Sequence, residues 1–297
     1  ANPDLRWEEV TLINIGFDAK IFKDVSVVFD IYRKDTDGVL AAQEVPGFVG
    51  FGSPIANVGN VRNEGIELEL GYEREFGNFN LDISGNVAYN QNELLKINDD
   101  LDFLPGFRYG PPGVEITRFT VGEPIGHLFG YQTDGLFQNQ SEVDAYVNAD
   151  GEPLQPEAAP GDIRFVDIDG DGDVDIDDRT NIGDGNPTWS FGTNLNIKYK
   201  NFEVAVFGQG FAGFDVFNIT RRFDLVGANF SAAALERWTG EGTSDNYPRI
   251  SQTDPNRNFS RSSDFYVENG SFFRIRNLQF GYTLPENALD KIGLGKT

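Results

Sequence analysis

The sequence predicts an all-β fold in which antiparallel strands form a partial arc of a transmembrane β-barrel with long extracellular loops. Three observations predict this fold class. Apolar residues occupy every second position over long runs, which is the period of a two-faced sheet. Tight turns alternate along the chain with long connections rich in Gly, Pro, Asn and Asp. No apolar run approaches the ~20 residues that a membrane helix needs.

The expected strands fall into segments with clear alternation: residues 7–36, 61–96, 187–216 and 271–284. By the period-two pattern these segments hold about seven or eight strands. Runs such as 61–75 and 189–199 exceed the ~5–6 residues of an ordinary globular strand and reach the ~9–11 that cross a bilayer at a tilt. Strand length therefore favours a membrane barrel over a soluble sheet.

Each expected strand has one apolar and one polar face. In the second segment, one face carries Ile66, Leu68, Leu70 and Tyr72, and the other carries Glu67, Glu69 and Glu73. In an outer-membrane barrel the apolar face contacts lipid and the polar face lines a wet lumen, whereas in a sandwich the apolar face packs against a second sheet. Near the end of the chain, Phe273 and Ile275 have the opposite parity to Leu278 and Phe280, which predicts a β-bulge near Asn277.

The connections differ in length between the two ends of the strands. Tight turns are expected at residues 22–24, 76–78 and 200–201, and long loops at residues 38–59, 91–187 and 210–269. Short turns at one end and long loops at the other are typical of outer-membrane barrels. Because a barrel in lipid leaves no strand edge unpaired, the strands indicate an incomplete arc that pairs with strands outside residues 1–297. An independently folded β-sandwich is the competing interpretation.

Composition excludes several functional classes. The chain has 24 basic and 47 acidic residues and a net charge of −23, so it offers no basic surface for nucleic acid. It has no Cys, which removes disulfides and thiolate sites, and its single histidine, His127, is expected in a loop without a catalytic partner. No signal-peptide pattern opens the chain and Met is absent, so an interior piece of a longer protein, or a processed product, is expected.

Residues 167–178 have the donor spacing of a calcium-binding loop. The donors fall at the usual positions: Asp167, Asp169 and Asp171 at 1, 3 and 5, the Asp173 carbonyl at 7, Asp175 at 9 and Asp178 at 12, with Gly172 providing the turn at 6. Hard oxygen ligands favour Ca²⁺ over softer metals. Position 12 is Asp rather than the usual Glu, and a solvated acidic turn is the alternative. The spacing predicts a structural Ca²⁺ that holds a long loop in place.

Short motifs carry a family resemblance that covers nearly the whole chain. In order they are NPDLRWE at 2–8, DIYRK at 30–34, NVGNVRNEGIEL at 57–68, VGEPIG at 121–126, GYQTDGLF at 130–137, GDIRF at 161–165, FGQG at 207–210, RWT at 237–239, YPR at 247–249 and ENGSFFRIRNL at 268–278. In content, order and spacing the chain resembles the C-terminal half of SusC/RagA-type TonB-dependent transporters of Bacteroidota.

The resemblance implies a barrel of roughly 22 strands with a plugged lumen, in which residues 1–297 are one part of the barrel domain. The plug domain and the remaining strands are then expected outside this chain. The implied activity is TonB-energised uptake of oligosaccharides or peptides across the outer membrane of a Gram-negative bacterium, with no enzymatic step. The implied partners are a SusD-like surface lipoprotein that closes over the barrel as a lid, TonB acting on the missing N-terminal region, the ligand, and outer-membrane lipid.

Aromatic residues in the expected loops are the candidate ligand contacts. Rings suited to stacking on sugars belong to Phe48, Phe51, Phe107, Tyr109, Phe129 and Phe211, and packing against neighbouring loops is the alternative. A rival function is a secreted, calcium-stabilised β-sandwich that binds glycans or acts as an adhesin. The two functions differ in what the apolar strand faces contact: lipid in a transporter barrel and protein in a sandwich. A glycoside hydrolase, a further rival, needs a close pair of carboxylates in a cleft.

Overall fold

The computed structural model describes residues 5–42, 54–97, 101–109, 113–221 and 229–285. Contacts between residues divide the chain into two compact units, which we call the barrel-arc unit and the insertion unit. The barrel-arc unit comprises residues 1–100, 187–214 and 270–297, and the insertion unit comprises residues 101–186 and 215–269.

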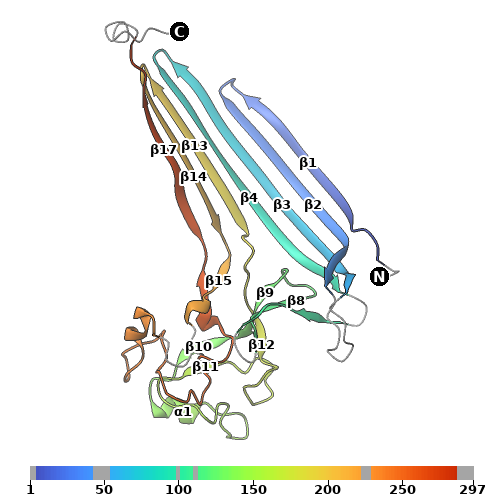
Figure 1. The fold of residues 1–297 in the computed structure, drawn as a ribbon, viewed down its shortest axis with the longest axis vertical. Helices are drawn as coiled ribbons and strands as arrows, with labels where there is room; N and C mark the ends of the chain where they lie inside the picture. The colour runs from blue at the N-terminus through green and yellow to red at the C-terminus, as the bar shows by residue number, and fades with distance from the viewer. Residues whose placement is uncertain (1–4, 43–53, 98–100, 110–112, 222–228, 286–297) are drawn as a thin grey trace. The chain divides into compact units, whose positions relative to one another are not determined.

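The barrel-arc unit contains one antiparallel sheet of seven strands, in the order β1-β2-β3-β4-β13-β14-β17 (Figure 1). The strands are β1 (Glu9–Ile21), β2 (Val25–Ala42), β3 (Ile55–Phe76), β4 (Phe79–Ile97), β13 (Trp189–Tyr199), β14 (Phe202–Ala212) and β17 (Phe272–Tyr282). Each strand pairs with the strand that precedes it in this order. The predicted all-β, antiparallel arc is confirmed.

The two ends of the sheet are built differently, as the sequence predicts. At one end, short turns join adjacent strands at residues 22–24, 77–78 and 200–201. At the other end, the register pairs Trp189 with both Tyr89 and Ala212. This pairing places the start of β13 beside the end of β14, whereas β4 continues in the same direction past Tyr89 to Ile97. Both long insertions therefore branch from the same end of the sheet.

The hairpin of β2 and β3 continues further than the sequence predicts. A long loop is expected from Gly38 onwards, but β2 continues to Ala42 and β3 begins at Ile55. Amide side chains explain the difference: Asn57 Nδ2 donates to the Gly38 carbonyl (2.7 Å), and the Gly38 N–H donates to Asn60 Oδ1 (3.2 Å). Here Gly and Asn bridge a shift in strand register instead of ending the strands.

Strand β17 contains the predicted β-bulge. Asn277 pairs with Phe207 and Ile275 pairs with Gly208, so Arg276 is the additional residue. Because of this extra residue, Phe273 and Ile275 lie on the same face of the strand as Leu278 and Phe280, although the first pair has odd numbers and the second has even numbers.

Aromatic side chains border the apolar face of the sheet at both ends. At the turn end, a row crosses five adjacent strands, each residue pairing with the next: Phe76, Phe79, Tyr199, Phe202 and Tyr282. At the insertion end, the rings of Tyr89 and Trp189 meet edge to face with centroids 4.9 Å apart. Phe79 and Tyr89 both lie on β4. They are about 34 Å apart along the strand at ~3.4 Å per residue, or about 26 Å along the barrel axis if the strand is tilted from that axis by ~40°.

The aliphatic side chains between these rows are exposed. Ile83 is 41% exposed, Ile66 43% and Leu278 57%. Among the described residues of the barrel-arc unit there is no second sheet to cover this face. A β-sandwich has such a second sheet, which buries the inner faces of both. The barrel-arc unit is therefore a single-layered sheet.

The insertion unit contains short strands where the sequence predicts long loops. It comprises β5 (Phe103–Pro105), β6 (Arg108–Tyr109), β7 (Val114–Glu115), β8 (Thr117–Thr120), β9 (His127–Tyr131), β10 (Thr133–Leu136), α1 (Gln140–Ala145), β11 (Ile163–Phe165), β12 (Arg179–Gly183), β15 (Asp215–Phe217), η2 (Ile219–Arg221), η3 (Ala232–Glu236), η4 (Asp264–Tyr266) and β16 (Val267–Asn269). Strands this short do not produce a recognisable period. Buried Leu136, Ile163, Phe165 and Val174 contribute to its core. Within the described ranges, no helix is long and apolar enough to cross a membrane.

Candidate functional site

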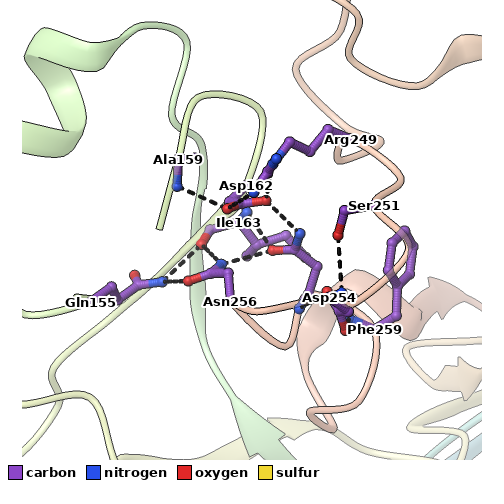
Figure 2. A network of polar contacts seen from close by, with 10 residues as sticks. Gln155, Ala159, Asp162, Ile163, Arg249, Ser251, Asp254, Asn256 and Phe259 are labelled. Atoms are coloured by element: carbon purple, nitrogen blue, oxygen red, sulfur yellow. Dashed lines mark hydrogen bonds and ion pairs between the residues drawn. The ribbon is translucent and has the colours of Figure 1, made fainter. Parts of the chain in front are cut away.

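A buried polar network joins the two insertions, with Asp162 at its centre (Figure 2). The Asp162 side chain is fully buried. Its carboxylate accepts two hydrogen bonds from the Arg249 guanidinium (2.6 and 2.9 Å), one from Asn258 Nδ2 (2.8 Å) and one from the Ala159 N–H (2.8 Å). The hydrogen bond to Asp162 raises the pKa of Arg249, although burial opposes this effect. Arg249 therefore stays charged, and the Asp162 carboxylate accepts four hydrogen bonds.

The same network holds the backbone of Ile163 in β11. The Ile163 N–H donates to Asn258 Oδ1 (2.9 Å), and its carbonyl accepts from Asn256 Nδ2 (3.0 Å) and Gln155 Nε2 (3.1 Å). Gln155 Oε1 in turn accepts from the Phe165 N–H (2.8 Å). Side chains of the second insertion therefore fix a strand of the first.

This network is not among the sites that the sequence predicts. Asp162 and Arg249 both lie in motifs that carry the family resemblance, but they are 87 residues apart and neither motif indicates the pairing. The available signal is that Asp162 and Arg249 both stand beside apolar or small residues in their motifs, where an unpaired charge is costly.

Three of the predicted calcium ligands meet in the structure. Asp167, Asp169 and Asp171 each place one carboxylate oxygen within 4.8 Å of the others. Asp167 also accepts hydrogen bonds from the Gly170 N–H (2.7 Å) and the Gly172 N–H (3.0 Å). Gly172 has a φ of 94°, in the left-handed region that favours glycine, as the expected turn at position 6 requires. The first half of the loop thus brings three of the predicted donors together.

Asp178, at the end of the loop, is buried and hydrogen-bonded to the loop backbone. Its side chain is 1% exposed, and it accepts hydrogen bonds from the Ile168 N–H (2.6 Å) and the Asp175 N–H (2.7 Å). The side chains of Asp173 and Asp175 accept from the N–H groups of Val174 (2.8 Å) and Asp177 (2.7 Å). The carboxylates of these three residues lie outside the group of oxygens that meet within 4.8 Å among the described residues, and the donor predicted at Asp173 is its carbonyl rather than its carboxylate. Carboxylates at positions 1, 3 and 5 fit a hard cation.

The neighbouring carboxylates repel the charged form of Asp169. The Asp171 N–H lowers the pKa of Asp169, but partial desolvation and the charges of Asp171, Asp178 and Asp167 outweigh it, so the pKa of Asp169 is raised. A bound divalent cation would instead lower the pKa of Asp169, because it attracts the charged form of the carboxylate.

The predicted ligand-contacting aromatics have different surroundings. Phe107 is 59% exposed. Phe129 is only 6% exposed, and its ring contacts the guanidinium groups of Arg118 and Arg179, which lie 3.5 and 5.1 Å from the ring centroid. Its ring is therefore occupied by cation–π contacts within the protein.

The other predicted aromatics that the structure describes belong to different units of the chain. Tyr109 is half-buried in β6, where it pairs with Val114. Phe211 belongs to β14 in the barrel-arc unit and contacts Phe272 edge to face, with centroids 5.7 Å apart. Phe48 and Phe51 lie outside the described residues.

His127 is buried at the start of β9, so the expected loop position is wrong. It is 1% exposed, and Nδ1 lies 3.3 Å from the Pro124 carbonyl. Burial lowers the pKa of His127, while the Pro124 carbonyl and the charge of Glu123 act in the opposite direction. A buried, neutral imidazole held by a backbone carbonyl is a core residue rather than an exposed catalytic base.

Long antiparallel strands with one apolar and one polar face, and large insertions at one end, define part of a large β-barrel. The chain belongs to the TonB-dependent receptor family, since residues 1–209 match the family model described as TonB dependent receptor-like, beta-barrel. The resemblance to SusC/RagA-type receptors is confirmed by the similarities below.

Individual relatives agree in sequence and in fold. The chain is 32% identical over 304 residues to TonB-dependent receptor P3 of Formosa agariphila, covering 99% of this chain and 29% of that protein. It is 24% identical to TonB-dependent receptor SusC of Bacteroides thetaiotaomicron, over 95% of this chain and 26% of that protein. A chain of the RagAB peptide importer in its closed-closed state is similar with a TM-score of 0.73 and 25% identity, over 97% of this chain and 30% of that one. The chain thus spans less than a third of the length of these relatives.

Proposed function

We propose that this chain is an interior part of an outer-membrane importer that is energised through TonB. The observation that carries the proposal is the exposed apolar face of the seven-stranded sheet, bordered at both ends by aromatic side chains. Outer-membrane barrels present to lipid an apolar band about 25 Å tall between two aromatic girdles. The spacing of about 26 Å between Phe79 and Tyr89 along the barrel axis is close to this height. The opposite face, with Glu67, Glu69 and Glu73, then lines the lumen.

The proposal also accounts for the open edges of the sheet. Strands β1 and β17 are the outer strands of the arc. In lipid an unpaired edge leaves backbone N–H and C=O groups without partners, so both edges pair with further strands of a barrel of roughly 22. All 297 residues then belong to the barrel domain, with the insertion unit as its extracellular part.

The cargo in this proposal is an oligosaccharide or a peptide, held between the insertion unit and a SusD-like lipoprotein lid. One relative is part of a peptide importer, which supports the peptide alternative, and the oligosaccharide alternative rests on the resemblance to SusC-type receptors. TonB acts through the N-terminal region of the complete protein. Import requires binding and release but no covalent step, so no catalytic residues are assigned.

Fractionation of cells that carry the complete protein tests the function. The protein is expected in the outer-membrane fraction, and uptake of its cargo is expected to stop when the gene for TonB is deleted. A protein recovered in the soluble fraction, or uptake that continues without TonB, would contradict the proposal.

We propose in addition that residues 167–178 bind a structural Ca²⁺. The support is the meeting of Asp167, Asp169 and Asp171 at positions 1, 3 and 5 and the inward position of Asp178 at 12. The ion would connect the ends of a loop that carries seven aspartates. Because the site is part of the folded insertion unit, binding stabilises that unit by mass action.

Removing calcium with a chelator is expected to speed hydrogen exchange over residues 160–187 while β13 and β14 stay protected. The increase reaches about a hundredfold if calcium had been present at ~100 times its Kd. Asp171→Ala should show the fast exchange without chelator. Asp177→Ala, an exposed neighbour at position 11, should behave like the unchanged protein. Equal protection with and without chelator would rule out a structural ion here.

A further inference from the structure

The insertion unit contains a pocket of about 490 Å³ that both insertions line. Its floor lies at the β10–β11 pair, where Leu136 and Ile163 are opposite each other and only 8% and 2% exposed. The volume is within the range of small-ligand sites. Because Asn256 and Asn258 hold the Ile163 backbone, the network around Asp162 fixes the floor before any ligand binds.

The charged side chains of the pocket wall are largely paired. Arg221 donates to Glu268 Oε1 (2.7 Å) and to the Phe265 carbonyl. Asp264 accepts from the Thr133 N–H (3.0 Å) and the Thr133 hydroxyl (2.5 Å). These bonds hold residues of the second insertion against β10, and they leave the Arg221 charge balanced by Glu268.

Asp245 and Asn246 provide the polar groups that remain free. Both side chains are exposed and line the pocket, and within the described part of the chain neither is in a hydrogen bond or ion pair. A carboxylate accepts strong hydrogen bonds from hydroxyl groups, and an amide both donates and accepts. Phe265 and Val267 add apolar surface to the same wall.

We propose that this pocket binds a neutral sugar unit of an oligosaccharide. The proposal rests on the import function above and specifies its substrate class. A sugar ring carries hydroxyls at its edge, which suit Asp245 and Asn246, and C–H groups on its faces, which suit the apolar wall.

Charge and backbone geometry argue against acidic ligands and against peptides that bind by strand addition. Asp245 and Asp264 face the pocket together with one cation, Arg221, which is already paired, so an acidic ligand is repelled. A peptide that binds by strand addition needs free backbone groups, but the Thr133 N–H is used by Asp264.

The test is calorimetric titration of the complete detergent-solubilised protein, in its complex with the lid, using defined probes. Maltotetraose, cellotetraose and xylotetraose represent neutral saccharides, tetragalacturonate represents acidic ones, and tetra-alanine represents peptides. At least one neutral tetrasaccharide is expected to bind, and Asp245→Ala and Asn246→Ala are each expected to raise its Kd about tenfold, the loss of one good hydrogen bond. Asp150→Ala, an exposed aspartate of the same unit away from the pocket, should leave the Kd unchanged.

Three results would overturn the sugar pocket: no binding of any neutral tetrasaccharide, binding that neither variant weakens, or binding of tetragalacturonate or tetra-alanine that the variants weaken. None of these results bears on the import function, because fractionation and TonB dependence are measured on the unchanged protein. If uptake proves independent of TonB while both variants still weaken sugar binding, the pocket stands and the import function fails.

Discussion

Replacing Asp162 with Ala is expected to destabilise the insertion unit by about 3–5 kcal/mol, the cost of removing one partner of a buried ion pair. Asp162 is fully buried and accepts bonds from Arg249, Asn258 and Ala159. Without the carboxylate, the Arg249 guanidinium keeps its charge in a largely enclosed position, and the buried Asn258 amide loses an acceptor. The backbone of Ile163, which Asn258 holds, should loosen as a consequence.

Hydrogen exchange of the Ile163 and Phe165 amides measures this change. Exchange should rise by at least about a hundredfold, since each 1.4 kcal/mol is a factor of ten. The matched control is Asp134→Ala, which removes an ion pair with Arg164 in which Asp134 is 70% exposed. That variant should cost less than about 1 kcal/mol, as exposed pairs do. Similar exchange in the two variants would show that the network does not hold the insertions together.

The second large effect is expected from charge on the apolar face of the sheet. Leu195 lies near the middle of β13, between Ile83 of β4 and Val206 of β14. If this face contacts lipid, Leu195→Arg should destabilise the folded barrel by about 2–4 kcal/mol, the cost of Arg at the bilayer midplane. Denaturant unfolding of the complete protein in lipid vesicles measures the loss.

Asn196→Arg is the control one residue further along the same strand. Asn196 points to the opposite face and donates to Asp82 Oδ2 (3.3 Å), so an arginine there gains a carboxylate neighbour. Its effect should stay within about 1 kcal/mol. Equal losses from the two substitutions would contradict a sheet with one face in lipid and the other in water.

The strands could be predicted from the sequence because each is long and keeps a period of two. The alternation in residues 189–199 gives the bounds of β13 as the structure has them, and the parity change before Leu278 gives the bulge. The strands could be recognised because one face of the sheet is apolar and the other is polar. In the proposed barrel one face of this single-layered sheet contacts lipid and the other contacts water, so the alternation is strict.

The insertion unit could not be predicted in the same way. Its strands are short, and its organisation depends on contacts such as Asp162 with Arg249, which join residues far apart in the sequence. The burial of a side chain in this unit also cannot be predicted from the sequence. Phe107 and Phe129 are both loop aromatics by sequence, but Phe129 is buried between arginines and Phe107 is exposed. The aspartate loop is the exception, because its donor spacing is local and its turn at Gly172 follows from that spacing.

Quenching by brominated lipids tests most directly whether the apolar face of the sheet contacts the bilayer. The chain has no Cys, so single cysteines at Leu195, Ile197 and Asn196 can each carry a fluorophore without competing thiols from this chain. In vesicles, the label at residues 195 and 197 should be strongly quenched, and the label at residue 196 should not. Absence of quenching at 195 and 197 would place protein against the apolar face and contradict the membrane barrel.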